Sequence, residues 1–167
     1  KSQMENFKPQ PQQFQISTLF DDTKKHFSSI ENIQFQFENS NNISLVTDEN
    51  YLKTIVRNLT GNAIKALVDV QNPRIIWKAF QENGNTILSI TDNGKGLVMP
   101  VKEDLSARKG GDEHISRASQ IIKDRIYLLN IKLKTKASFT IDNNNNEPGV
   151  IVKIYLPKIN KDESTAN

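Results

Sequence analysis

Stretches in which apolar and polar residues alternate come in pairs along this sequence, and single helical patterns separate the pairs. The alternating stretches are residues 33–37 and 43–47, residues 75–82 and 86–92, and residues 137–141 and 150–156. Alternation with a period of two is typical of strands that bury one face. Because neighbouring strands in a sequence commonly pair as hairpins, the pattern predicts three hairpins in one mixed, mostly antiparallel sheet.

Three helical patterns accompany these strands. The first covers residues 18–30, with Ser17 as its N-cap, and the last includes Ile115, Ala118, Ile121, Ile122 and Leu129. The middle pattern, roughly Tyr51 to Val70, has apolar residues at helical spacing and follows Asp48, which can cap it. Strand pairs that alternate with single amphipathic helices predict an α+β fold, a two-layer sandwich with about three helices on one face of the sheet.

Composition narrows the function further. The chain has 167 residues, 36% of them hydrophobic, which is enough for one domain with its own core. It contains no cysteine and only two isolated histidines, which excludes disulfides, thiolate metal sites and cysteine catalysis. The 22 Lys and Arg residues are interleaved with 19 Asp and Glu residues, so we expect no nucleic-acid partner. We expect an extended lead-in over residues 1–13, a domain over residues 14–157 and a polar tail over residues 158–167.

A polar stripe runs beside the apolar face of the long middle helix. It contains Asn58, Asn62, Lys65 and Asp69. Amide oxygens one helical turn apart can contact one ligand, and Lys65 adds a positive charge. Mg²⁺ prefers oxygen ligands and often bridges nucleotide phosphates, so the stripe is suited to a metal–phosphate group. Taken alone, the pattern is better explained as a solvated polar flank.

A glycine-containing segment follows the second strand of the middle pair. Its residues are Asp92-Asn93-Gly94-Lys95-Gly96. A carboxylate at the end of an apolar strand can accept a hydrogen bond from the exocyclic amine of a purine, and the glycines let the backbone approach a ligand. A glycine turn that closes a hairpin is the alternative interpretation. Residues 93–112 have no regular pattern, and a loop of this length indicates a lid.

The order of these features resembles the GHKL superfamily of ATP-binding domains, from about Phe14 to Pro157. Residues 58–65, Asn-Leu-Thr-Gly-Asn-Ala-Ile-Lys, resemble the N box of sensor histidine kinases, and residues 92–96 resemble their G1 box. The resemblance implies the Bergerat ATP-binding fold, with ATP and Mg²⁺ as cofactors. It also implies that Asn62 binds magnesium and that Lys65 lies on the phosphate side.

The same resemblance implies roles for the remaining box residues. Asp92 reads adenine, and Gly94 and Gly96 are the G1 glycines. Asn58 occupies the catalytic position at which hydrolytic relatives such as gyrase carry a glutamate that activates water. An amide cannot act as a general base at neutral pH, so Asn58 favours transfer over hydrolysis.

One motif departs from the family pattern. Typical kinases enter the next helix through GxGxG, whereas this sequence places His114, Ser116 and Ala118 at those glycines. Backbone N–H groups at the helix N-terminus can still face phosphate there, together with these three residues. Three outcomes are open: His114 contacts phosphate, Gly110 and Gly111 supply the flexibility, or nucleotide binding is weakened.

Together these features imply the catalytic ATP-binding domain of a two-component sensor histidine kinase, which transfers the γ-phosphate to a histidine outside this chain. The implied partners are a response regulator and the protein's own dimerisation and phosphoacceptor domain, in a homodimer. The implied location is cytoplasmic, in a membrane-anchored sensor, without direct membrane contact. The alternatives are a gyrase-like or chaperone-like ATPase domain and a degenerate, non-catalytic interaction module.

Overall fold

The computed structural model describes residue 8 and residues 10–96, 113–144 and 147–157, apart from the side chains of residue 41 and residues 113–119. Its elements are β1 (Gln12–Gln15), α2 (Ile16–His26), β2 (Gln34–Asn39), the short 3-10 turn η1 (Ser40–Asn42), β3 (Ser44–Thr47), α3 (Glu49–Ala66), β4 (Arg74–Glu82), β5 (Asn85–Asp92), α4 (Glu113–Leu133), β6 (Ser138–Asn143) and β7 (Val150–Pro157). The polar tail and most of the expected lid lie outside the described residues.

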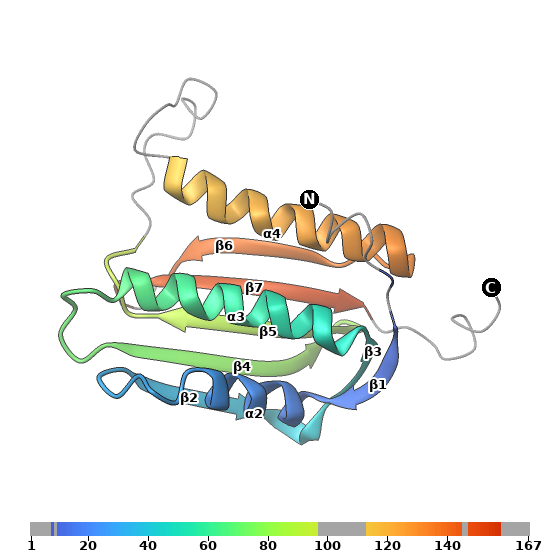
Figure 1. Ribbon diagram of the computed structural model, residues 1–167, viewed down its shortest axis with the longest axis horizontal. Helices are drawn as coiled ribbons and strands as arrows, with labels where there is room; N and C mark the ends of the chain where they lie inside the picture. Colours follow the sequence, from blue (N-terminus) through green and yellow to red (C-terminus); the bar gives the residue numbers. More distant parts are fainter. Residues whose placement is uncertain (1–7, 9, 97–112, 145–146, 158–167) are drawn as a thin grey trace.

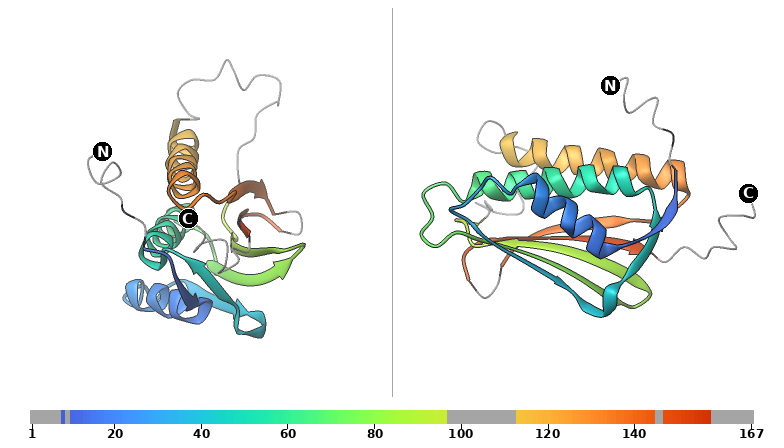
Figure 2. Two further views of the ribbon diagram at one scale, coloured as in Figure 1. Left: turned by 90° about the vertical axis from the view of Figure 1, so that its right-hand side faces the viewer. Right: turned by 60° about the horizontal axis from the view of Figure 1, so that its bottom comes forward.

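The predicted α+β class and mostly antiparallel sheet are confirmed. Five strands form a sheet in the order β2-β4-β5-β7-β6, and only the β2–β4 pair is parallel. Figures 1 and 2 show α2, α3 and α4 together on one side of this sheet. The β4–β5 hairpin turns at Asn83 and Gly84, both with positive φ, as its Asn-Gly sequence predicts. β6 and β7 form the other predicted hairpin.

The first predicted hairpin is wrong in its pairing, although both strands exist. β2 pairs in parallel with β4, whereas β3 pairs antiparallel with β1 in a separate two-stranded sheet. The chain leaves β2 through η1, and the Ile43 carbonyl then accepts a hydrogen bond from the Ile16 N–H, 2.8 Å away, beside β1. Alternation reveals which face of a strand is buried but not which strand lies beside it.

Helix α3 has the predicted cap, but it begins two residues before the expected start at Tyr51 and ends four residues before the expected end at Val70. Asp48 is the N-cap: its Oδ1 accepts a hydrogen bond from the Tyr51 N–H at 3.0 Å, and its Oδ2 accepts one from the Gln10 N–H at 2.9 Å. The apolar face is fully buried, with Leu52 and Val56 both at 0% exposure. The helix ends at Ala66 rather than Val70.

A buried indole fixes α3 to the sheet. Trp77 on β4 is 0% exposed, and its Nε1–H donates to the Thr60 hydroxyl on α3 at 3.0 Å. That hydroxyl donates in turn to the Val56 carbonyl at 2.7 Å, so the polar atoms of this contact are satisfied inside the core. The position of α3 above β4 and β5 is therefore set by a directional contact as well as by apolar packing.

One local prediction is corrected by the structure. Ser17 does not cap α2, because β1 leads directly into the helix, the N-cap position is Gln15, and buried Ile16 is already helical. Ile121 lies in α4, as the pattern predicts, but it is 48% exposed, whereas Ile122 and Leu129 are buried. None of the helices in the described part of the chain is long and apolar enough to cross a membrane.

Candidate functional site

A buried carboxylate lies where β5 leaves the sheet. Asp92 is 6% exposed, and its Oδ1 accepts hydrogen bonds from the Gly94 N–H at 2.9 Å and the Val150 N–H at 3.4 Å. No hydrogen bond from another described residue reaches the second oxygen, Oδ2. Asp92 is thus held in place through Oδ1.

Burial sets the electrostatics of this carboxyl group. Desolvation raises the pKa of Asp92 above the ordinary value of 3.8, and the hydrogen bonds from Gly94 and Val150 partly oppose the shift. A ligand group that donates a hydrogen bond to Oδ2 would favour the ionised form further. The site is therefore suited to a ligand that donates a hydrogen bond to the carboxylate.

The glycines around Asp92 stand where side chains do not fit. A Cβ atom at Gly94 would lie 2.7 Å from the Ala66 carbonyl oxygen, at the end of α3. A Cβ at Gly149, where φ is +139°, would lie 1.8 Å from the carbonyl oxygen of Asp92. The segment after β5 is therefore in backbone contact with both α3 and the turn that precedes β7.

Gly96 occupies a left-handed conformation in the same segment, with φ of +86°. A Cβ there would lie 3.0 Å from Oδ1 of Asn143 and 3.5 Å from the Gly149 carbonyl oxygen. This backbone conformation favours glycine, as does the close approach of the neighbouring turn. Both glycines of the predicted motif thus have a structural reason to be glycine.

Helix α3 brings its polar stripe to the same end of the molecule. Asn58, Asn62 and Lys65 lie in the second half of α3, and the helix ends at Ala66, which faces Gly94. Asn58 is half-buried, whereas Asn62 and Lys65 are exposed. The structure therefore places Lys65 next to the residue that touches the Asp92 segment, with Asn62 and Asn58 successively further along the helix.

The third predicted group lies at the start of α4. His114 and Ser116 are in its first turn and Ala118 is in its second, because the helix begins at Glu113. Figures 1 and 2 show this end of α4 on the same side of the molecule as the end of β5 and the C-terminal end of α3. The N–H groups of the first helical turn lack carbonyl partners within the helix, whereas that of Ala118 lies beyond this turn.

Several residues that support the site were not predicted. The Asn93 side chain accepts a hydrogen bond from the Arg74 N–H at 2.7 Å and donates one to the Asn72 carbonyl at 2.9 Å. Val150 approaches Asp92 from 58 positions along the chain, and its neighbour Gly149 approaches with it. The Pro-Gly pair before the last strand was the available signal, since it predicts a turn, but a turn alone does not indicate what it contacts.

The donor set fits a magnesium ion that is shared with phosphates. The exposed Asn62 amide can offer one oxygen, and Mg²⁺ commonly keeps waters and binds phosphate oxygens at its other positions. Among the described residues there is no group of three or more His, Asp and Glu side chains that could hold a metal by themselves.

Comparison with known proteins supports the fold. No protein-family model matches the sequence, and no curated protein does. Among solved structures, the catalytic domain of histidine kinase ThkA superposes with a TM-score of 0.69 at 19% identity, covering 89% of this chain and 96% of that one. Histidine kinase AdeS of Acinetobacter baumannii gives 0.68 at 16% identity, covering 95% and 74%, and the mycobacterial sensor histidine kinase MprB gives 0.61 at 17%, covering 87% and 97%. The chain therefore has the fold of histidine kinase catalytic domains.

Proposed function

We propose that this chain is the ATP-binding catalytic domain of a two-component sensor histidine kinase. The observation that carries the proposal is the buried Asp92 carboxylate, which is fixed through Oδ1 and has Oδ2 left for a ligand. It lies at the end of β5 beside α3, the helix that carries Asn62 and Lys65, in a fold shared with histidine kinase catalytic domains. In this function Oδ2 accepts a hydrogen bond from the adenine amine.

The phosphates extend from adenine toward α3 and the start of α4. Lys65 supplies positive charge, and Asn62 supplies an amide oxygen to the magnesium ion, which neutralises phosphate charge when bound. Phosphoryl transfer depends mainly on positioning and electrostatic stabilisation, so these residues need no covalent chemistry. Asn58 bears an amide, which cannot remove a proton from water, and this limits hydrolysis.

The acceptor and partners lie outside the chain under this proposal. The γ-phosphate goes to a histidine on a dimerisation and phosphoacceptor domain of the homodimeric protein. A response regulator then receives it; among the structural neighbours, ThkA has been solved in complex with the response regulator TrrA. The proposed domain spans residues 14–157, and its place is the cytoplasmic side of a sensor.

Calorimetric titration with ATP and Mg²⁺ tests the proposal. We expect the parent domain to bind ATP, and Asp92→Asn to bind at least tenfold more weakly, because a charge-assisted hydrogen bond worth ~1.5–3 kcal/mol is lost. Asp21→Asn is the matched control, since Asp21 is an exposed carboxylate on α2. Equal affinity in the parent and Asp92→Asn would contradict the role of Asp92.

A degenerate interaction module is the second candidate. It is favoured by the start of α4, where His114, Ser116 and Ala118 are already helical. If the parent binds no ATP, the triple change of these residues to glycine decides between a lost phosphate site and a module of another kind. Recovery of ATP binding supports the kinase ancestry of the site, whereas no binding by either protein supports the module.

A further inference from the structure

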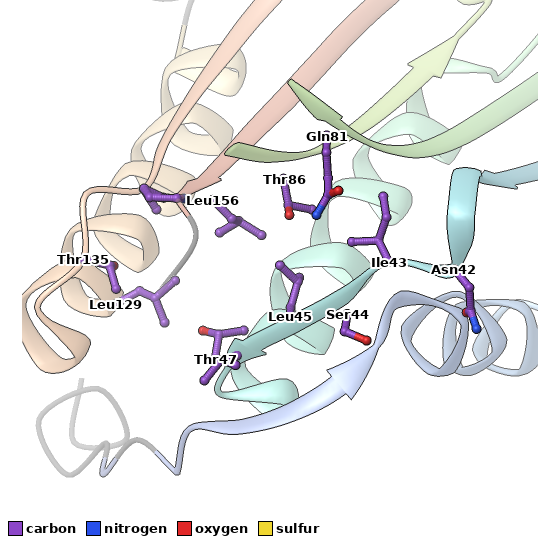
Figure 3. Close-up of a pocket in the computed structure, with 13 residues that line it drawn as sticks. Asn42, Ile43, Ser44, Leu45, Thr47, Gln81, Thr86, Leu129, Thr135 and Leu156 are labelled. Carbon is purple, nitrogen blue, oxygen red and sulfur yellow. The ribbon is translucent and has the colours of Figure 1, made fainter. Parts of the chain in front are cut away.

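A cavity lies at the end of the sheet opposite Asp92. Its volume is about 390 Å³, and Figure 3 shows side chains from three parts of the fold pointing toward this common space. Ile43, Leu45 and Thr47 of β3 form one wall. The ends of β4, β5 and β7 form the second wall, and Leu129 of α4 lies on the third. The cavity is therefore enclosed by elements that are distant in sequence.

The register of the sheet explains why this space is open. Thr86 of β5 pairs with Gln81 on one side and with Leu156 on the other, so their three side chains project from one row toward β3. β3 belongs to the two-stranded sheet with β1 and therefore does not continue the five-stranded sheet. The cavity is the gap between these two sheets, closed laterally by Leu129.

The chemistry of the walls is neutral. Among the described residues that line the cavity none is charged. Leu45, Leu129 and Leu156 are buried apolar residues, whereas the Gln81 amide is exposed at the edge. Because a buried charge without a partner is strongly unfavourable, these walls select against ionised ligands.

Two buried hydroxyl groups supply hydrogen-bonding capacity. Thr86 is 1% exposed and Thr47 is 5% exposed, and both line the cavity. A hydroxyl group can both donate and accept, so these side chains can exchange hydrogen bonds with a molecule that occupies the cavity. Figure 3 shows Thr86 and Gln81 side by side at the same wall, so one ligand group can reach both.

The cavity is separate from the site at Asp92. Thr86 and Asp92 lie on the same face of β5, six residues apart, which corresponds to roughly 20 Å at about 3.3 Å per residue. The volume corresponds to roughly a dozen water-sized groups at ~30 Å³ each, close to the lower limit of known ligand pockets. A single small molecule can therefore fill it without reaching the nucleotide site.

We propose that this cavity is a second binding site, for a small neutral molecule with an apolar ring or chain and one hydroxyl or amide group. The apolar part lies against Leu45, Leu129 and Leu156, and the polar group bonds with Thr86 and Gln81. The assignment rests on the cavity alone and holds whether or not the chain binds ATP.

Methyl NMR of the nucleotide-free domain tests this proposal with benzyl alcohol as the probe and benzoate as its charged counterpart. We expect benzyl alcohol to shift the methyl signals of Leu45, Leu129 and Leu156 saturably, with a dissociation constant in the millimolar range, and to leave Val56 unchanged. Benzoate binds at least tenfold more weakly because its charge finds no partner. Shifts that do not saturate, or equal binding of the two probes, would overturn the assignment.

Two variants locate the binding. Gln81→Phe places a ring at the exposed edge of the cavity and abolishes the saturable shifts, and unchanged Val56 signals verify that this variant is folded. Thr86→Val keeps the side-chain shape but removes the hydroxyl, so we expect it to weaken the binding of benzyl alcohol at least threefold. Thr140→Val, an exposed position on β6, is the matched control and leaves affinity unchanged. Undiminished binding in Gln81→Phe would show that the probe binds elsewhere and would refute the site.

Discussion

The two ends of β5 differ in how the protein uses the space beside one strand. At Asp92, backbone fills the space so completely that Gly94 and Gly149 cannot bear a Cβ without contact below 3.0 Å. At Thr86, side chains surround a cavity of about 390 Å³. The first end contains a buried ionisable group held by backbone N–H donors, whereas the described residues that line the cavity at the second end are all neutral. A buried charge is stable only where nearby groups hold it by hydrogen bonds, whereas neutral side chains can line an open cavity without such partners.

The largest expected effect is on stability, when a glycine near each end of β5 is replaced by alanine. Gly149→Ala forces a Cβ to within 1.8 Å of the Asp92 carbonyl oxygen, and we expect a loss of about 3 kcal/mol or more in the free energy of unfolding, from overpacking and backbone strain together. Gly84→Ala, in the turn at the Thr86 end, has positive φ but nothing within 4 Å, so strain alone costs about 1 kcal/mol. Urea unfolding measures both. Similar losses in the two variants would mean that the ends do not differ in packing.

Removal of the Asn62 amide tests the proposed nucleotide site at the Asp92 end. We expect Asn62→Ala to lose most of the magnesium dependence of ATP binding while the contacts to the base remain, because only an oxygen ligand of the ion is removed. Titration of each variant with ATP, with and without Mg²⁺, measures this. Asn50→Ala changes an exposed amide in the first turn of the same helix and serves as the control. Undiminished magnesium dependence in Asn62→Ala would place the ion elsewhere.

A smaller effect is expected for the stability of Thr86→Val. The Thr86 side chain is buried at the wall of the cavity, so replacement of its hydroxyl by a methyl group raises the free energy of unfolding by roughly 0.5–1 kcal/mol. Urea unfolding of the ligand-free protein checks the sign. A clear loss of stability would indicate that the hydroxyl is well satisfied in the folded state, which would weaken the contrast with Asp92.

The smallest effect is a dependence on pH that only one end shows. Burial raises the pKa of Asp92, so the folded state holds this proton more tightly than the unfolded chain does. The resulting stability is present below pH 3.8 and is lost as pH rises through the raised value. Asp92→Asn lacks this loss, so its stability relative to the parent increases across that window and then levels off. Thr86→Val should show a difference from the parent that does not vary with pH.

Local signals in the sequence predicted the parts of the fold that local chemistry decides. Asp48 indicated where α3 starts, and Asn83-Gly84 indicated the β4–β5 turn. The partner of β3 could not be found in this way, because β1 supplies it from residues 12–15, within a stretch without clear periodicity. The alternation of apolar and polar residues correctly predicted that β3 is a strand, but it did not indicate which strand pairs with it.

In the candidate site too, residues within one short segment could be predicted from the sequence, whereas contacts between distant segments could not. Asp92, Gly94 and Gly96 were identified from five consecutive residues, and their geometry has a clear structural reason. The second hydrogen bond to Asp92 comes from Val150, which only the pairing of β5 with β7 brings close. Long-range contacts of this kind leave no local periodicity in a single sequence, so Gly149 and Val150 were missed.

The Asp48 carboxylate connects the segment before β1 to the first turn of α3. Asp48 accepts the Gln10 N–H with one oxygen and the Tyr51 N–H with the other, so the segment before β1 and the first turn of α3 share a single anchor. A displacement of Gln10 removes a hydrogen bond from the group that caps α3, and fraying of α3 loosens the hold on Gln10. The two events are thermodynamically linked, so a change in the position of Gln10 alters the stability of the first turn of the helix that carries Asn58, Asn62 and Lys65.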